Sequence, residues 1–295
     1  MGVSASQYGN VPENPAQQYN TLGGGNPNLS PEVADTVTGG LVITPKALSG
    51  FTAAFDYYNI KIKNTIGTLG SNDILNQCAA TGSPLLCGLV HRDKFGTTWA
   101  TNAGYVTTTN QNVGKRNVEG IDVNTTYAKP LGGAGLFTVN LIGTYLMQEG
   151  IDTGLYAYDC VGYFGNTCGN PAPKWRHLAR FSLNTKFKTT ISVGWRMIGA
   201  VTVDDANPNP ALSNPDNLAL DKVNNIDKIP AFHYMDLGAT WKMTKNAQLV
   251  LGVNNLFDKE PPLAVGQSNN DYAAGFYGTY DSLGRFFRVS MQFTF

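Results

Sequence analysis

Cysteine and histidine are the residue types in this chain best suited to covalent, catalytic or metal chemistry. Four cysteines fall as two close pairs, Cys78 with Cys87 and Cys160 with Cys168, each inside a segment rich in Gly, Asn, Thr and Pro. Zinc sites usually place ligands two to four residues apart and add further Cys or His, which the three histidines do not supply. The spacing favours two short disulfide loops and an oxidising compartment over four free thiols, and predicts no metal site.

Residues that could carry catalysis are not grouped in any pattern that catalysis needs. The sequence has no nucleophile elbow, no His-Glu-x-x-His pair and no carboxylates that strand geometry would bring together in a cleft. His91 and His233 have no convincing Ser or Asp partner for a hydrolytic site. The glycine clusters at 23–25, 39–40 and 132–135 do not lie between a strand and a helix, as nucleotide-binding loops do. We therefore expect neither an enzyme nor a bound cofactor.

Basic residues form a regular set between residues 174 and 196. All of them have even numbers, so those up to Lys186 would lie on one face of an extended strand, and Arg196 would lie on the next strand. That face could bind an anionic ligand or an acidic part of another domain, and Arg176, Arg180 and Arg196 are the candidate contacts. The interpretation that we favour is pairing with carboxylates of the same wall. The basic set is Lys174, Arg176, Arg180, Lys186 and Arg196, and the carboxylates are Asp56, Asp122 and Asp236.

Aromatic residues gather in the long polar segments of the chain. Rings on loops can stack on sugars or on flat chelates and can supply much of the binding energy. Rings at a membrane surface also form an interfacial belt, and the sequence leaves the two roles open. The candidate ligand contacts are Trp99, Tyr156, Tyr158, Tyr272 and Tyr277, within a wider set that includes Tyr163, Phe164 and Phe276.

The composition indicates strands and turns. Only 14% of the 295 residues are charged, against about 25% in an average protein, and 21 basic residues balance 21 acidic ones. A nucleic-acid partner is therefore not expected, because the basic excess that such binding needs is missing. Glycine (33), tyrosine (14) and phenylalanine (14) fill the gap, with many Asn and Thr. We expect an all-β chain.

A long charge-free run, between Lys129 and Glu149, has nearly the length of a membrane-spanning helix but the period of a strand. Its apolar residues alternate with polar ones, which predicts a strand with one apolar and one wet face. Odd positions hold Phe137, Val139, Leu141, Tyr145 and Met147, and even positions hold Thr138, Asn140 and Thr144.

The same alternation recurs along the chain and predicts an antiparallel meander of about nine long strands. Short turns alternate with long polar segments, as in outer-membrane barrels with short periplasmic turns and long extracellular loops. The strands of a soluble β-sandwich also alternate apolar and polar residues, but they are seldom joined by four connections as long as these polar segments. The predicted strands are 33–44, 50–64, 100–128, 136–148, 174–187, 189–199, 233–243, 247–257 and 279–295.

Several motifs, in order, match one family. NPNLSPEVADTVTGGLVITP (26–45), VGKRNVEGIDVNTTY (113–127), GVNNLFDKEPP (252–262) and GRFFRVSMQFTF (284–295) resemble strands from the C-terminal barrel region of the TonB-dependent outer-membrane receptors. NDILNQCAATGSPLLCGLVHRD (72–93) is similar to a disulfide-bearing loop of that family. Each motif is weak alone, and their shared order across 26–295 makes the resemblance specific.

The resemblance implies active transport across the bacterial outer membrane, of a siderophore, cobalamin, haem or oligosaccharide-type ligand. Members combine an N-terminal plug domain and a TonB box with a barrel of about 22 strands. The chain is then expected to be a fragment: an irregular lead-in at 1–32 and a partial barrel over 33–295, the C-terminal part of such a barrel. Its partners would be outer-membrane lipid, the remaining strands and plug, and, through the plug, the TonB complex.

The aromatic end of the chain has a meaning within this resemblance. In the family, the closing strand carries a terminal aromatic that the barrel-assembly machinery reads, which assigns that signal to Phe293 and Phe295. The alternative is a small passive outer-membrane pore or adhesin barrel. It would need a closing strand within 1–32, a stretch without alternation.

Overall fold

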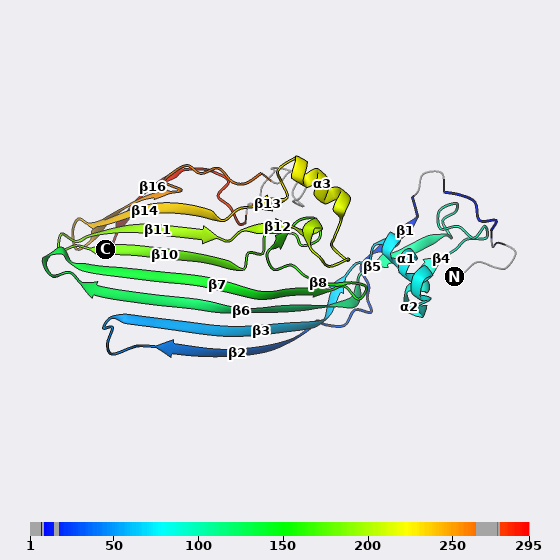
Figure 1. Cartoon of the computed structure of the whole chain (residues 1–295), viewed down its shortest axis with the longest axis horizontal. Coiled ribbons are helices and arrows are strands. Elements are labelled where there is room, and N and C mark those ends of the chain that lie inside the picture. The colour runs from blue at the N-terminus through cyan, green and yellow to red at the C-terminus, as the bar shows by residue number, and fades with distance from the viewer. Residues whose placement is uncertain (1–6, 8, 15–17, 264–275, 277, 295) are drawn as a thin grey trace. The chain divides into compact units, whose positions relative to one another are not determined.

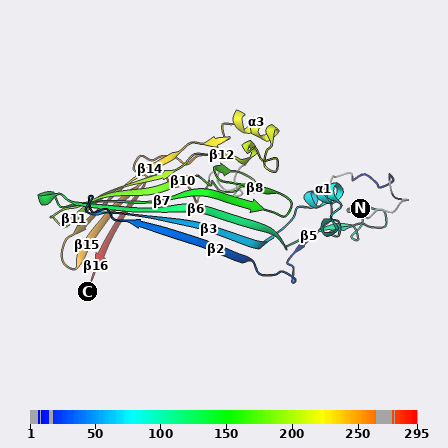
Figure 2. The same ribbon diagram turned by 60° about the horizontal axis from the view of Figure 1, so that its bottom comes forward.

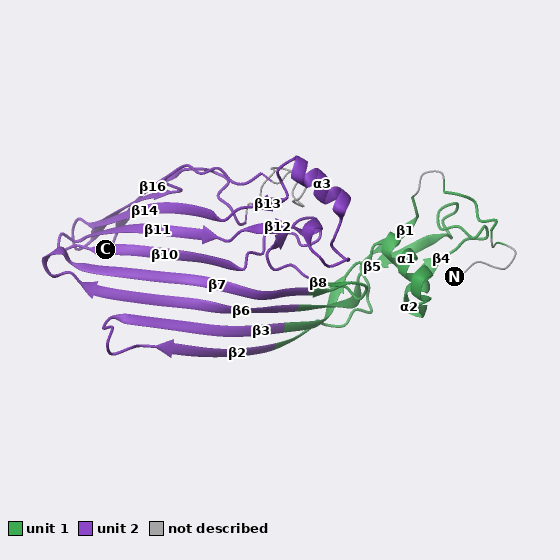
Figure 3. Cartoon of the chain, viewed as in Figure 1, with its two compact units in different colours: residues 1–35, 61–116, 151–157 green, residues 36–60, 117–150, 158–295 purple. Residues whose placement is uncertain are grey.

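The structure is a computed structural model that describes residues 7, 9–14, 18–263, 276 and 278–294. The chain divides into two compact units (Figure 3). Unit 1 comprises residues 1–35, 61–116 and 151–157, and unit 2 comprises residues 36–60, 117–150 and 158–295.

Strands make up nearly half of the described residues. They are β1 (Thr21–Gly24), β2 (Val33–Ile43), β3 (Phe51–Gly67), β4 (Val90–His91), β5 (Tyr105–Thr109), β6 (Gln111–Pro130), β7 (Leu136–Asp152), β8 (Ala157–Asp159), β9 (Tyr163–Phe164), β10 (Trp175–Asn184), β11 (Thr189–Ile198), β12 (Val201–Val203), β13 (Lys228–Ile229), β14 (Phe232–Lys242), β15 (Ala247–Asn254) and β16 (Phe286–Phe293). The helices are α1 (Ser71–Thr81), α2 (Pro84–Cys87) and α3 (Pro215–Val223), with 3-10 turns η1 (Gly132–Ala134) and η2 (Asp204–Ala206).

A ten-stranded sheet follows the order β16-β15-β14-β11-β10-β7-β6-β3-β2, with β8 paired to β7 (Figure 1). Long strands that follow one another in the chain are neighbours in the sheet, and the pairs from β7 to β16 are antiparallel. Figure 2 shows β14, β15 and β16 turning out of the plane of β7 and β10, so the sheet is curved. The predicted all-β meander is confirmed.

Strand register aligns the two side-chain types into rows across unit 2. One apolar row runs Val139, Phe181, Val193, Leu237, Val253 and Phe287. One row of small or polar residues runs Thr138, Ser182, Ser192, Gly238, Gly252 and Arg288. Because side chains alternate along a strand, the odd-numbered residues of these strands form an apolar face and the even-numbered residues form a polar face.

The predicted strand 100–128 divides into two strands that belong to different sheets. Residues of β6 stay in the main sheet, whereas β5 pairs in parallel with β1 and antiparallel with β4 in a three-stranded sheet. Val106 on β5 is fully buried against Ile74 and Leu86 of the helices. Burial in this second core, in unit 1, takes β5 out of the meander.

The long connections contain helices that alternation could not predict. In α1, Ile74 and Cys78 lie four residues apart and are both buried, and Gly82 ends the helix in the left-handed conformation at φ 64°. In α3, the side chain of Asn214 caps the helix by accepting a hydrogen bond from the backbone N–H of Asn217.

The loops of unit 2 have a core of their own. It is an apolar cluster that includes fully buried Phe164 and the nearly buried Tyr234 and Tyr280. Phe164 meets Phe276 edge to face at a centroid distance of 5.6 Å. Both predicted disulfides, Cys78–Cys87 and Cys160–Cys168, are present.

The last strand is shorter than predicted. β16 begins at Phe286 rather than at 279, because residues 280 and 281 fold back into this loop core. Phe293 lies on β16 and is 56% exposed on the apolar face. Phe295 lies outside the described residues.

Phe164→Ala should loosen this loop core. The fully buried ring would leave a cavity, at a cost of about 3–5 kcal/mol. Hydrogen exchange at the amides of Thr202 and Val203, which pair with β9, should accelerate strongly. As the control, Phe187→Ala removes a ring that is 73% exposed, and exchange at the same amides should stay within twofold of the wild type.

Candidate functional site

The polar face of unit 2 is organised around Arg196 on β11. Its Nε and Nη2 donate to the carboxylate of Asp236 at 2.7 and 2.9 Å. Its Nη1 and Nη2 donate to the carboxylate of Asp281 at 2.7 and 2.6 Å. The guanidinium also lies over the ring of Tyr234, with a centroid distance of 4.7 Å. Four donor contacts on two carboxylates leave this arginine little capacity for another anion.

The Arg196 cluster ties a loop to the wall of the sheet. Asp281 lies in the loop before β16, and its backbone N–H donates to the hydroxyl of Tyr234 on β14 at 3.2 Å. The next residue back, Tyr280, is buried and meets the ring of Phe232 at 5.0 Å. The pairing of Arg196 with Asp236 is the interpretation that we favoured from the sequence. Asp281 was not anticipated, because 85 residues separate it from Arg196.

Arg176 and Arg180 are also on the polar face, and both are exposed. Register places Arg180 opposite Gly194 and places Arg288 opposite Gly252. Arg180 and Arg288 line a hollow of about 250 Å³ over β10, β11, β14 and β15. Among the described residues, no carboxylate lies within ion-pair distance of Arg176, Arg180 or Arg288. The structure therefore separates Arg196, which is neutralised, from arginines that remain open to an anion.

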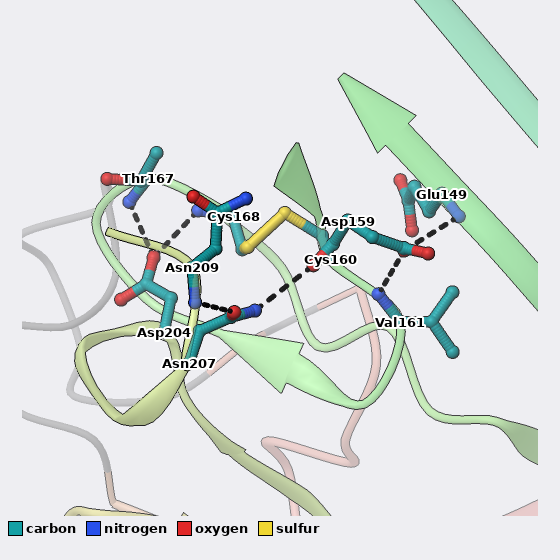
Figure 4. Close-up of a disulfide and its surroundings, with 9 residues drawn as sticks. All are labelled: Glu149, Asp159, Cys160, Val161, Thr167, Cys168, Asp204, Asn207 and Asn209. Carbon is teal, nitrogen blue, oxygen red and sulfur yellow. Dashed lines mark hydrogen bonds between the residues drawn. A yellow bond between two sulfur atoms is a disulfide. The ribbon is translucent and has the colours of Figure 1, made fainter. Parts of the chain in front are cut away.

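The Cys160–Cys168 loop is held by a buried carboxylate (Figure 4). Asp204 is 3% exposed and accepts hydrogen bonds from the backbone N–H groups of Thr167 and Cys168, each at 2.8 Å. Gly165 approaches the Asp204 side chain so closely that a Cβ there would overlap it. Asp204 thus stabilises the backbone of the loop.

A second carboxylate fixes the other end of the same loop. Asp159 accepts from the backbone N–H groups of Glu149 at 3.1 Å and Val161 at 2.9 Å, as Figure 4 shows. The amide of Asn207 donates to the backbone carbonyl of Asp159 at 3.2 Å. Within the described ranges, no group of three or more His, Cys, Asp or Glu is arranged to hold a metal ion.

A family model described as "TonB dependent receptor-like, beta-barrel" matches residues 2–256 of this chain. The chain belongs to this family. TonB-dependent receptors are transporters, not enzymes, so the prediction of a non-enzyme is confirmed. No curated protein matches the chain in sequence.

Solved structures share the fold of this receptor chain. A mutant of the ferric enterobactin receptor PfeA from Pseudomonas aeruginosa is 18% identical, with a TM-score of 0.58, and the match covers 93% of this chain and 33% of that one. The FrpB iron transporter from Neisseria meningitidis is 14% identical (TM-score 0.55, covering 93% and 33%). The siderophore receptor PirA from Acinetobacter baumannii is 14% identical (TM-score 0.54, covering 92% and 33%). The chain spans about one third of the length of these structures.

The loop aromatics of the receptor chain have different surroundings. Phe164 and Phe276 are core residues. Tyr156 accepts a hydrogen bond on its hydroxyl from the Gln77 amide at 3.3 Å, within unit 1. Tyr158 is half-buried on β8 in unit 2. The remaining predicted contacts are Trp99, which lines a hollow in unit 1, and Tyr272 and Tyr277, which lie outside the described residues.

Membrane crossing by helices is not a feature of the described residues, where every helix is too short and too polar to span a bilayer.

Arg196→Met should release the loop before β16. The substitution leaves the carboxylates of Asp236 and Asp281 facing each other, 23% and 27% exposed, without a counter-ion. We expect the free energy of unfolding to fall by about 1–3 kcal/mol and hydrogen exchange over residues 278–284 to become faster. The control is Arg285→Met, which removes an exposed pair with Asp258 at 4.0 Å and should cost at most about 1 kcal/mol. Equal effects of the two variants would contradict the assignment of Arg196 as the loop anchor.

Asp205→Asn should stabilise the loop after β12 at neutral pH. Burial raises the pKa of Asp205, and the carboxylates of Asp204 and Asp221 raise it further. The contribution of Asp205 to stability is thus fully present below its unfolded pKa of about 3.9 and is lost as pH rises through the higher folded pKa. The variant should therefore exceed the wild type in stability at pH 7 and match it below about pH 4.

The difference in stability between the variant and the wild type is measured by unfolding the loop in urea and monitoring hydrogen exchange over α3. Asp216→Asn, at an exposed position in the first turn of α3, is the control and should not stabilise. A stability gain of Asp205→Asn that persists unchanged below pH 4 would rule out the electrostatic cause.

Proposed function

We propose that this chain forms part of the wall and the extracellular loops of an outer-membrane receptor that takes up a siderophore-type ligand by TonB-dependent active transport. The remaining barrel strands and the plug would come from other parts of a longer receptor, and the TonB complex would act through that plug. Within the chain, the barrel portion would cover residues 33–295, with residues 1–32 as a lead-in.

One observation carries the proposal: the register-matched apolar face of the meander, in a chain of the TonB-dependent receptor family. Leu237 (38% exposed), Val289 (74%) and Phe287 (66%) are accessible on this face, so no layer of the described part of the chain covers them. Large contiguous apolar surface is unfavourable in water and favourable against hydrocarbon. The bacterial outer membrane is therefore the proposed location and its lipid a proposed partner.

The two end strands of the sheet support incorporation into a larger barrel. Along the described path, β2 and β16 each have one neighbour, and every residue of both strands is exposed. An unpaired strand edge in hydrocarbon costs several kcal/mol for each free backbone group. Further strands of the same receptor would satisfy these edges. The aromatic Phe293 on β16, with Phe295, would serve as the signal for the barrel-assembly machinery.

The polar face supports a ligand that carries negative charge. Arg180 and Arg288 border the hollow described above, and Arg176 lies two residues from Arg180 on the same strand. With Arg196 occupied by Asp236 and Asp281, Arg176 and Arg180 are the better candidates for contact with an anionic ligand. The structures that share this fold include a ferric enterobactin receptor and a siderophore receptor, which supports a siderophore-type ligand.

Uptake by the receptor that contains this chain tests the proposal. The receptor would be expressed in a bacterium that lacks its own siderophore receptors, and uptake of radioactive iron would be measured with a panel of ferric siderophores. We expect uptake of at least one siderophore and its loss when the TonB complex is deleted. Uptake that does not depend on TonB would support the passive-pore alternative instead.

Leu237→Arg tests the orientation of the wall in the same receptor. A charge at mid-strand on the lipid face should cost about 2–4 kcal/mol and reduce the amount of receptor in the outer membrane. Thr240→Arg, on the polar face of the same strand, is the matched control and should insert normally. Normal insertion of both variants would mean that the odd-numbered face does not contact lipid.

A further inference from the structure

Lysines are concentrated at one end of the long strands of unit 2. The short turns β2–β3, β6–β7, β10–β11 and β14–β15 lie at this end, on the left of Figure 1. Together with adjoining strand residues they contain no Asp or Glu, over the ranges 44–50, 129–135, 185–188 and 242–246. We call the lysines of these ranges the basic rim, which consists of Lys46, Lys129, Lys186, Lys188, Lys242 and Lys245.

Backbone contacts join the four turns into one continuous rim. The backbone N–H of Ala128 donates to the carbonyl of Gly50 at 2.9 Å, which links the β2–β3 turn to the end of β6. Strands β7 and β10 stay paired up to the last residue of β10. The backbone N–H of Lys242 donates to the carbonyl of Lys188 at 3.0 Å. The sheet therefore holds the lysines of successive turns next to one another.

The described part of the chain does not neutralise the basic rim. All six lysines are exposed, and no carboxylate of the described residues lies within ion-pair distance of any of them. Like charges on neighbouring strands destabilise each other, and Lys188 and Lys242 are such neighbours. An anion from outside the chain would relieve this repulsion.

The opposite end of the same strands has a different charge. The connection between β11 and β14 contains more acidic residues than basic ones. A general need for polar turns would not place lysines without carboxylates at one end only, so the asymmetry points to a partner specific to the end with the short turns. The charged residues of the β11–β14 connection are Asp204, Asp205, Asp216, Asp221, Asp227, Lys222 and Lys228.

Exposed apolar side chains lie among the lysines of the rim. The ammonium of Lys186 lies 5.6 Å from the centroid of the Phe187 ring. Trp241 has the same parity on β14 as Leu237, so its ring continues the apolar face to the end of the strand. Lysines can lay their apolar stems along hydrocarbon while the charged group reaches a polar layer. The exposed apolar residues in or beside the four turns are Leu48, Leu131, Phe187 and Trp241.

We propose that the basic rim binds the headgroups of anionic phospholipids in the periplasmic leaflet of the outer membrane. The lipid phosphates would accept hydrogen bonds from the lysines, and the acyl chains would contact the apolar side chains beside them. An acidic protein would match the charge, but it would not need apolar residues that continue the lipid-facing wall. This inference rests on the outer-membrane location proposed above and names the lipid and the leaflet.

Native mass spectrometry of the receptor that contains this chain, purified in detergent, tests the inference. The lipids are phosphatidylglycerol, phosphatidylcholine with the same acyl chains and, in a third arm, lipid A. We expect phosphatidylglycerol to bind more tightly than phosphatidylcholine. Each basic side chain beside an anionic lipid surface strengthens binding by roughly fivefold. The double variant Lys188→Gln/Lys242→Gln should therefore weaken phosphatidylglycerol binding by roughly tenfold or more and leave phosphatidylcholine binding unchanged.

Two further variants serve as controls. Lys222→Gln/Lys228→Gln removes the same charge from exposed positions in the β11–β14 connection, and its phosphatidylglycerol binding should stay within about twofold of the wild type. Phe187→Ala removes an exposed ring from the rim and should weaken binding of both phospholipids by the same factor. Circular dichroism confirms that each variant keeps its β-sheet content.

Equal binding of phosphatidylglycerol and phosphatidylcholine by the wild-type receptor would overturn the inference. Wild-type affinity of Lys188→Gln/Lys242→Gln for phosphatidylglycerol would do the same. Preferential binding of lipid A through these lysines would place the rim at the outer leaflet, and binding of poly-glutamate in place of phosphatidylglycerol would assign it to an acidic protein; either result contradicts the proposal. The measurement does not use transport, so a receptor that takes up siderophores but shows no lipid preference refutes this inference alone.

Discussion

Backbone hydrogen bonding is the constraint on which the rest of this structure depends. A strand that lies against hydrocarbon must pair its backbone N–H and C=O groups with neighbouring strands, because no water is present to bond them. Pairing in a fixed register then sets which side chains share a face, as in the row from Val139 through Leu237 to Phe287. A slip of one residue in a single strand would move its apolar set onto the polar face.

The long connections solve the same problem in a different way. They leave the main sheet, and several of their backbone groups are bonded by single side chains: the buried Asp93 and the half-buried Asn20 in unit 1, and the half-buried Asp159 and the buried Asp204 in unit 2. The Cys160–Cys168 disulfide lies beside one of these groups, because the backbone N–H of Cys168 donates to Asp204. These loops are therefore compact substructures with cores of their own, which include Val106 in unit 1 and Phe164 in unit 2.

Arg196 shows how the wall and the loops of unit 2 are coupled. Its position on the polar face follows from strand register, and its two carboxylate partners come from β14 and from the loop before β16. Because both sets of hydrogen bonds share one guanidinium, the loop conformation depends on the alignment of the strands. The same sharing leaves Arg196 little capacity for another anion, whereas Arg176, Arg180 and Arg288 have no carboxylate within ion-pair distance among the described residues.

The sequence by itself determined the class, the strands and the faces of this protein, because a period of two is local and is visible within a single strand, as in the seventeen residues of β7. The two disulfides could also be predicted from the sequence, because the partners are only eight or nine positions apart. Only the tertiary structure decided that β5 leaves the meander, that Asp281 binds Arg196, and that Asp204 supports the backbone of a loop. Each of these depends on residues between 36 and 85 positions apart or on a separate small core, and no local period encodes such contacts.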